Sequence, residues 1–448
     1  MTTGSVWKTI LLFALPIMIG NLLQQLYNTV DGIVVGNFVS EAALAAVGSC
    51  GTLAFVFLSV SIGMSVGCGI FIAQLFGAKE LGKLKTAVST SLILLIGLGV
   101  TLAVAGCAAA RFWLRDLMNV AEGEILDQAV VYFAIYAVGL VFQFAYNAVA
   151  QILRSVGDSK ATLYFLAVAA VVNLVLDLVF VICFRWGVAG AAIATVLAQL
   201  GSVIVSFAYM FKKYPMFRMN RQEFVFDRKM CGTILKLAIP STLQTCVVSF
   251  GNVFMQRLVN YFGAVTMAAY TVGSRIENYM FVPIQGLNAS ISTFTGQNVG
   301  AGRLDRVQEA AKKVSIMSLI ITGAFAFLAF VCAAPISRLF GIGGETLSQS
   351  VEYIHFQSPF FLIFGVYMMF SGLLQGSGDV VFTSCATLSS LGVRVLVAYG
   401  MEYLMHIGYS SCWKSVPIGW GVGLAMMLIR FFSGVWKNKA VVRKQSAE

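Results

Sequence analysis

Three acidic side chains lie inside long apolar segments of this 448-residue chain: Asp31, Asp177 and Glu277. An ionisable group within a membrane-spanning segment costs roughly 2.5–3.5 kcal/mol on insertion scales, so it is a functional candidate by default. When two carboxyl groups share a poorly solvated pocket, they do not easily ionise together, and one tends to keep a proton near neutral pH. Asp31 and Asp177 therefore indicate reversible binding of H⁺ or of a small metal cation.

Polar side chains accompany the first acid along one helix face. Gln24, Asn28 and Asp31 are spaced i, i+4 and i+7, a spacing that brings them onto one side of a helix. Asn21 and Gln25 lie beside them and complete one polar stripe. We expect Asn28 and Asp31 to bind the cation, and Gln24, Gln25 and Tyr27 to line a substrate cavity.

A second polar group surrounds Asp177. Asn173 precedes it by four residues, and Thr195 follows in the next apolar segment among small and apolar neighbours. Carboxylate, amide and hydroxyl oxygens suit a hard cation such as Na⁺, and they equally hold a proton. We expect Asp31 and Asp177 together to bind the cation, whereas Asn173 and Thr195 taken singly favour hydrogen bonding between helices. The alternative for such groups is interhelical hydrogen bonding, worth about 0.6 kcal/mol on average in membranes.

The segments that carry these residues are apolar enough to span a membrane. The chain is 59% hydrophobic and 11% charged, which excludes a soluble globular protein. A stretch of about 20 apolar residues crosses a bilayer. We expect twelve spanning helices, near 8–35, 42–76, 88–110, 124–150, 161–184, 187–211, 233–261, 266–298, 313–334, 346–374, 381–405 and 416–437. The first is expected to be retained, because no small-residue cleavage site follows it.

The two halves of the chain repeat each other. Ala73–Ala78 returns as Gly296–Ala301 (296 − 73 = 223), and Leu153–Asp158 returns as Leu374–Asp379 (374 − 153 = 221). Six spans in each half place both halves in the same orientation, related by an axis along the membrane normal. The predicted fold is an all-α polytopic membrane protein with two six-helix bundles. The predicted divisions are 1–211 for the first bundle, 212–232 for a basic cytoplasmic linker, 233–437 for the second bundle and 438–448 for a tail.

The second bundle differs from the first at the acidic positions. At the same register it carries Phe254 for Asp31, Arg394 for Asn173 and Ala398 for Asp177. Glu277 is a candidate counter-ion for Arg394 or Arg275, as a structural pair or as part of transport. We place Glu277 and Arg394 among the residues of the substrate cavity. The Gly-Asp pairs that end at Asp158 and Asp379 are typical of turns and helix caps.

The distribution of charge indicates how the chain is oriented in the membrane, and it does not indicate a binding partner. The net charge is +11, and most of the 30 basic residues fall in loops on one side if both termini are cytoplasmic. This positive-inside pattern predicts a multi-pass protein of the bacterial inner membrane with cytoplasmic N- and C-termini, and no nucleic-acid partner. The nine cysteines form no C-x-x-C pair, so neither a disulfide framework nor a metal cluster is expected.

Motifs of enzymes are missing from the sequence. It contains no H-E-x-x-H, no G-x-x-x-x-G-K-[ST] and no G-x-S-x-G at a strand-to-helix turn. We expect no catalytic activity and no cofactor. Without a phosphate-binding loop, an ion gradient remains as the source of energy.

Several short motifs, in order, resemble the multidrug and toxic compound extrusion (MATE) family of cation-coupled antiporters. They are Gln24–Asp31, Asn37–Gly48, Ala73–Ala78, Arg154–Asp158, Asn173–Asp177, Ala189–Thr195 and Gly296–Ala301. The resemblance covers Lys8 to about Lys437. It implies a twelve-helix, two-lobe fold and export of organic cations in exchange for Na⁺ or H⁺. It also carries the family's acids over to Asp31 and Asp177, with Asn173 and Thr195 as their neighbours in the cation site. One subgroup of the family also carries acids in the seventh and tenth spans. Here the seventh span has no acid, and Glu352 lies at the start of the tenth, a pattern nearer the DinF-like branch. The resemblance therefore does not choose between H⁺ and Na⁺.

The function that this resemblance implies is export of small organic cations, often aromatic, in exchange for H⁺ or Na⁺ by alternating access, and we expect a monomer in the bilayer to carry it out. The alternative is a flippase for lipids or lipid-linked saccharides, which would need several basic residues along the cavity, where Arg394 is the only deep one. A membrane-embedded enzyme would need a clustered acid–base or metal constellation, and none is visible in the sequence. A passive channel would need a ring of charged residues or a filter loop, and neither appears.

Overall fold

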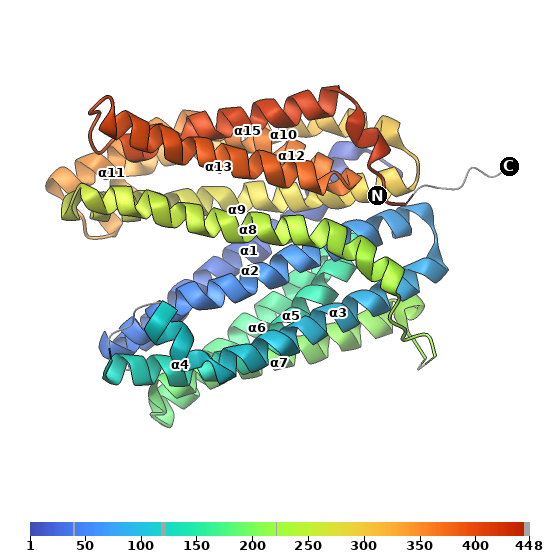
Figure 1. Cartoon of the computed structure of the whole chain (residues 1–448), viewed down its shortest axis with the longest axis horizontal. Helices are drawn as coiled ribbons and strands as arrows, with labels where there is room; N and C mark the ends of the chain where they lie inside the picture. Colours follow the sequence, from blue (N-terminus) through green and yellow to red (C-terminus); the bar gives the residue numbers. More distant parts are fainter. Residues whose placement is uncertain (39–40, 118–121, 221, 443–448) are drawn as a thin grey trace. The chain divides into compact units, whose positions relative to one another are not determined.

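The computed structural model is helical (Figure 1), with no β-strand among the residues that it describes. It describes the backbone of residues 1–38, 41–117, 122–220 and 222–442. The side chains of 27–38, 41–47, 49, 52, 117 and 250 lie outside the described part. For the described residues, the all-α class predicted from the apolar segments is confirmed.

The first half contains α1 (Val6–Phe38), α2 (Glu41–Ala78), α3 (Leu81–Ala108), α4 (Ala110–Phe112), the π-helix η1 (Trp113–Leu117), α5 (Glu124–Ser155), α6 (Ser159–Asp177), the π-helix η2 (Leu178–Cys183), α7 (Gly187–Lys213) and the 3₁₀-helix η3 (Pro215–Phe217). The second half contains α8 (Arg228–Tyr261), α9 (Ala264–Gly300), α10 (Leu304–Leu339), α11 (Gly344–Gln357), the 3₁₀-helix η4 (Ser358–Phe360), α12 (Phe361–Ser377), α13 (Val380–Tyr403), α14 (Ser411–Lys414), α15 (Val416–Phe432) and the 3₁₀-helix η5 (Val435–Asn438).

Eleven helical segments are long and apolar enough to cross a membrane by length and composition. Each overlaps one of the twelve predicted stretches. The twelfth stretch, 266–298, is α9, which is 37 residues long and carries Arg275 and Glu277 in its first half. In the described part of the chain, each predicted stretch therefore coincides with a long helical segment, although 346–374 is divided into α11 and α12 and composition alone identifies eleven of the twelve.

Contacts divide the chain into two compact units: unit 1 is Met1–Met18 with Leu243–Glu448, and unit 2 is Ile19–Thr242. In unit 2, α5 contacts α2, α3 and α7, and α6 contacts α7; in unit 1, α12 contacts α9, α10 and α15. The unit boundaries fall inside α1 and α8, two residues beyond Pro16 and Pro240. The divisions predicted at 211, 232 and 437 stay a prediction.

Unusual backbone geometry repeats in the register of the sequence repeat. Arg185 and His406 have φ of 55° and 53° and are 221 residues apart (406 − 185). Lys79 and Gly302 have φ of 62° and 74° and are 223 residues apart (302 − 79). Positive φ is uncommon for residues other than glycine. Its recurrence at corresponding positions therefore supports the duplication independently of the sequence motifs.

One helix is continuous in the first half and broken in the second. α5 runs for 32 residues, whereas its counterpart is divided into α11 and α12 by the 3₁₀-helix Ser358–Phe360. Pro359 stands where the register has Val138 (359 − 221 = 138). Proline lacks an N–H and clashes with the preceding helical turn, so Pro359 favours a break here, although other prolines of the chain lie inside continuous helices.

Candidate functional site

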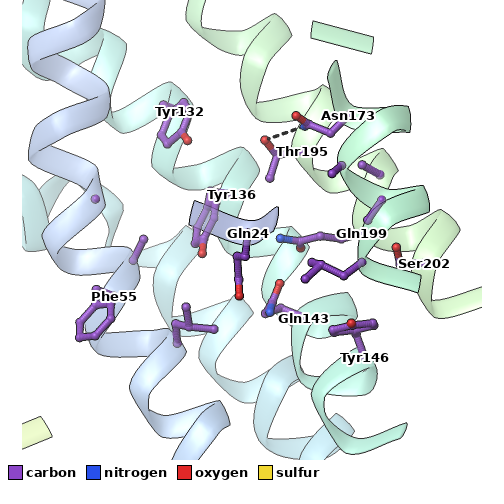
Figure 2. Close-up of a pocket in the computed structure, with 17 residues that line it drawn as sticks. Gln24, Phe55, Tyr132, Tyr136, Gln143, Tyr146, Asn173, Thr195, Gln199 and Ser202 are labelled. Carbon is purple, nitrogen blue, oxygen red and sulfur yellow. Dashed lines mark hydrogen bonds between the residues drawn. The ribbon is translucent and has the colours of Figure 1, made fainter. Parts of the chain in front are cut away.

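Unit 2 contains a cavity of about 350 Å³ between α1, α2, α5, α6 and α7 (Figure 2). Its polar lining consists of Gln24, Tyr132, Tyr136, Gln143, Tyr146, Asn173, Thr195, Gln199 and Ser202. The other lining residues are glycine, alanine, leucine and Phe55. No Lys, Arg, Asp or Glu is among the described residues that line it. A cavity of this size, walled by aromatic and amide groups, suits a small organic ligand.

Helical spacing explains how the lining is assembled. On α5, Tyr132, Tyr136 and Gln143 lie at i, i+4 and i+11, so they share one face. On α7, Thr195, Gln199 and Ser202 lie at i, i+4 and i+7. Two apolar helices therefore each turn a narrow polar stripe toward the same space. Figure 2 shows the amides of Gln24, Gln143 and Gln199 close to the ring of Tyr136.

At one end of the cavity, Asn173 connects the acid Asp177 to Thr195. Asn173 Nδ2 donates to Thr195 Oγ1 at 3.4 Å, the contact drawn in Figure 2. With the amide turned over, Nδ2 instead donates to Asp177 Oδ2 at 2.7 Å while Oδ1 accepts from the Thr195 N–H at 3.2 Å. In the second orientation both the nitrogen and the oxygen of the amide form a hydrogen bond. Asp177 is the last residue of α6 and 1% exposed, and the π-helix η2 follows it directly. Such turns are frequent at functional sites.

The structure brings together part of the predicted site. Asn173, Thr195 and Gln24 line the cavity, and Asp177 joins it through Asn173. Gln25 is half-buried on α1 and is not one of the lining residues. The predicted residues Tyr27, Asn28 and Asp31 lie outside the described side chains, although the α1 backbone is helical past them, to Phe38. No cluster of three or more His, Cys, Asp or Glu side chains suited to a metal ion occurs in the described part of the chain.

The cavity also contains residues that the sequence interpretation missed. Tyr136, Gln143, Tyr146 and Gln199 belong to its lining. Their helical spacing on α5 and α7 indicates a polar face on each helix, because amides are rare in an apolar span, but it does not indicate which way that face points.

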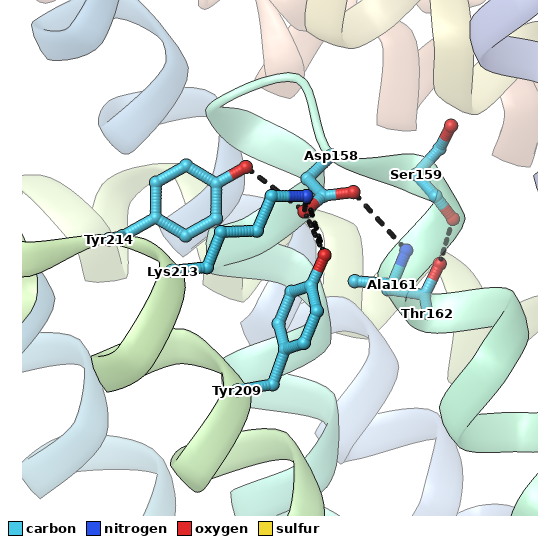
Figure 3. A network of polar contacts seen from close by, with 7 residues as sticks. All are labelled: Asp158, Ser159, Ala161, Thr162, Tyr209, Lys213 and Tyr214. Carbon is cyan, nitrogen blue, oxygen red and sulfur yellow. Dashed lines mark hydrogen bonds and ion pairs between the residues drawn. The ribbon is translucent and has the colours of Figure 1, made fainter.

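A second polar network of unit 2 lies at the opposite end of α6 (Figure 3). Asp158 accepts the N–H of Ala161 at 3.2 Å, which makes it the predicted N-cap. Its other oxygen accepts from Tyr209 at 3.0 Å, Lys213 at 2.9 Å and Tyr214 at 3.0 Å. Burial opposes ionisation of Asp158, but these four donors outweigh it and lower the pKa of the carboxyl. The network ties the start of α6 to the end of α7.

Unit 1 holds its own buried polar cluster. The hydroxyl of Tyr353 donates to Glu277 Oε2 at 2.5 Å. Arg394 Nη2 lies 3.5 Å from the hydroxyl of Tyr270, and the rings of Tyr270 and Tyr353 are in edge contact at 5.6 Å. Glu277 and Arg394 therefore lie in one cluster, joined through two tyrosines, and neither lines the cavity of unit 2.

Aromatic side chains of unit 1 occupy positions that correspond to part of the cavity lining of unit 2. Three lining residues have larger aromatic counterparts in the register: Phe281 for Leu58 (281 − 58 = 223), Phe364 for Gln143 (364 − 143 = 221) and Trp420 for Gln199 (420 − 199 = 221). The ring of Phe364 lies 4.7 Å from that of Phe281 and 4.8 Å from that of Trp420. The counterparts of residues that surround a cavity in unit 2 therefore pack against each other in unit 1.

Many apolar spanning helices around a polar, ligand-sized cavity define a multi-pass membrane protein of the transporter class. The MatE family model matches residues 16–179 and 240–400. The chain is 30% identical over 447 residues to "Probable multidrug resistance protein YoeA" of Bacillus subtilis (strain 168), covering 98% of this chain and 96% of that protein.

Solved structures give the same result. "Crystal structure of MATE in the bent conformation" has a TM-score of 0.90 and 25% identity, covering 97% of both chains. "Outward-facing conformation of a multidrug resistance MATE family transporter of the MOP superfamily" also has a TM-score of 0.90 and 25% identity, with 97% of each chain covered. This chain belongs to the MATE family.

Proposed function

We propose that this protein is a secondary active multidrug antiporter, which exports organic compounds, often cationic and aromatic, in exchange for H⁺ or Na⁺ by alternating access. The observation that carries this proposal is the 350 Å³ cavity of unit 2, together with the buried carboxyl group that reaches it through Asn173. The names of the relatives support drug export. They do not favour the flippase alternative, and neither does a cavity whose described lining contains no basic residue.

The proposed mechanism couples two ligands through one cluster. A cation from outside binds at Asp177 with Asn173 and Thr195, and at Asp31 with Asn28. If the cation and the drug stabilise opposite conformations, each lowers the affinity for the other, and this coupling is reciprocal. The aromatic and amide lining supplies stacking surfaces and hydrogen-bond partners for the drug, including Gln24, Tyr136 and Gln199. The prediction that Gln25 and Tyr27 line a substrate cavity stays a proposal. The same prediction for Glu277 and Arg394 also stays a proposal, and it would concern unit 1, where both lie in a buried cluster.

The remaining features of the proposal concern the cell. We place the protein in a bacterial inner membrane, acting as a monomer, with both termini cytoplasmic and with no cofactor beyond the coupling ion. The basic loops support this orientation by the positive-inside rule.

Everted membrane vesicles test the proposal, because export appears in them as uptake. A fluorescent organic cation is added, and an H⁺ or Na⁺ gradient is imposed. Wild-type protein is expected to accumulate the dye under one of the two gradients, which identifies the coupling ion. Asp31→Asn and Asp177→Asn are expected to abolish accumulation, whereas Asp127→Asn, at an exposed position of α5, is expected to retain it. Wild-type vesicles that respond to neither gradient would rule out antiport.

The cavity is tested separately from the coupling site. Gln199→Trp introduces the residue that its counterpart Trp420 carries, and it is expected to fill the cavity and abolish dye binding. Val205→Trp, on an exposed part of the same helix, is the matched control. Wild-type binding by Gln199→Trp would show that the drug does not occupy this cavity.

A further inference from the structure

The buried charges of unit 1 occupy positions that correspond to the cavity wall of unit 2. Glu277 is the counterpart of Ala54 (277 − 54 = 223), and Arg394 is the counterpart of Asn173 (394 − 173 = 221). Tyr353 is likewise the counterpart of Tyr132 (353 − 132 = 221). Ala54, Tyr132 and Asn173 all line the cavity of unit 2. Glu277 of unit 1 therefore occupies a position that corresponds to the cavity wall of unit 2. The guanidinium of Arg394 occupies the position at which unit 2 has the neutral amide of Asn173.

The geometry keeps the opposite charges near each other without direct contact. Glu277 and Arg394 do not form one of the ion pairs within 4.0 Å in the described part of the chain. Instead Glu277 accepts from Tyr353 at 2.5 Å and Arg394 reaches Tyr270 at 3.5 Å. The charged and titratable groups of this cluster come from four elements: Tyr270 from α9, Tyr353 from α11, Arg394 from α13 and Cys412 from α14. The Glu277 carboxylate contacts one phenol oxygen, and the guanidinium of Arg394 lies against a second.

The charge balance of this cluster decides what it can bind. A buried carboxylate that loses its positive partner is left uncompensated, which is strongly unfavourable in an apolar surrounding. With Arg394 present, the pair is neutral overall and has no need of a cation from solution. With a neutral residue at position 394, the cluster would resemble the amide-containing cluster of unit 2, and it would attract a small cation.

We propose that Arg394 is a tethered cation, and that Glu277, Tyr353 and Tyr270 form a latent monovalent-cation site which H⁺ or Na⁺ enters only when the guanidinium is removed. The exchangeable cation sites of the wild-type protein are then confined to unit 2. This inference concerns ion binding alone, and it does not depend on the identity of the transported drug.

The test counts exchangeable cations on the purified, full-length protein. Equilibrium binding of radioactive Na⁺ gives the sodium stoichiometry, and potentiometric titration over roughly pH 5–9, where buried carboxyl groups titrate, gives the proton stoichiometry. Arg394→Asn introduces the residue found at the counterpart position, Asn173. It is expected to bind one more cation per chain than the wild type, and Arg394→Asn with Glu277→Gln is expected to return to the wild-type number. Arg394→Lys, which keeps the charge, is expected to match the wild type.

Two results would overturn the proposal: an unchanged stoichiometry in folded, monodisperse Arg394→Asn protein, or a gain that persists when Glu277 is replaced as well. If Arg394→Asn does not fold, Glu277→Gln tests the part of the proposal that concerns the wild-type protein. Its cation count is expected to equal that of the wild type, because Glu277 exchanges no ion while Arg394 is present. Loss of one cation in Glu277→Gln would show that Glu277 is an ordinary exchangeable site.

Discussion

Asp158 combines a helix cap with an ion pair, and the two roles can be separated by substitution. Asn keeps the cap to Ala161 but loses the charge that faces Lys213, whereas Ala loses both. We expect Asp158→Asn to lower the free energy of unfolding by about 1 kcal/mol at pH 7, since Lys213 is half-exposed. We expect Asp158→Ala to lower it by roughly a further 1 kcal/mol.

The effect of Asp158 depends on pH in a defined direction. Its pKa is lower in the folded state than the unfolded value of about 3.9, so its ionic contribution is present above about pH 4 and is lost as the pH falls through the folded value. The difference in unfolding temperature between wild type and Asp158→Asn is therefore expected to vanish in acid. Glu309→Gln, from an exposed pair with Lys313, is the control. A difference that persists in acid would contradict the ionic role.

At the residue scale, the sequence predicted contacts that follow one helix better than contacts between helices. Asn173 and Asp177 lie one turn apart on α6, so their proximity followed from spacing alone. The contact of Asn173 with Thr195 crosses from α6 to α7, and only the resemblance to a family supported it beforehand. Gln143 and Gln199 face the cavity because of how α5 and α7 are rotated in the bundle, and this rotation is not determined by either segment alone.

At the scale of elements, two helices each belong to both units. α1 and α8 pass from one unit to the other two residues after Pro16 and Pro240. A proline inside a helix removes one backbone hydrogen bond and allows bending. We expect Pro16→Ala and Pro240→Ala to stiffen these points, lowering the rate of dye transport several-fold while leaving dye affinity unchanged.

The matched control is Pro335→Ala, because Pro335 lies inside α10, which belongs entirely to unit 1. Transport rates in vesicles and equilibrium dye binding are measured on the same preparations. If all three substitutions slow transport equally, the effect comes from general helix stiffening and not from the unit boundaries.

The sequence predicted the helices more completely than their interruptions. Each of the twelve apolar stretches overlaps a long helix, because a bilayer leaves few alternatives to a continuous helix. The stretch 346–374 was predicted as one span, and the structure divides it at Ser358–Phe360. A proline in a span either bends the helix or breaks it, depending on its neighbours, so Pro359 alone does not predict which of the two occurs.

At the scale of the whole molecule, orientation follows from loop charge. Both termini and the basic segment around Lys212–Lys236 are expected inside, and the loop before α5 outside. In a cysteine-free background, we expect a membrane-impermeant maleimide to label Glu122→Cys in intact cells and to label Gln222→Cys only in everted vesicles. Both positions are exposed. Labelling of Gln222→Cys in intact cells would show that the topology is the opposite of the one predicted.

The division of α1 between units has a consequence for how the protein is made. Ser290 donates to the carbonyl of Ile10, so the start of α1 is secured by a helix from the far half of the chain. The ribosome completes Val6–Met18 first, yet their partners in unit 1 follow only after the 224 residues of unit 2 (242 − 19 + 1). At about 5–20 residues per second this interval lasts about 10–45 s. Lipid must solvate that part of α1 meanwhile, and a nascent chain that stalls after Thr242 holds a first helix whose protein partner has not yet been synthesised.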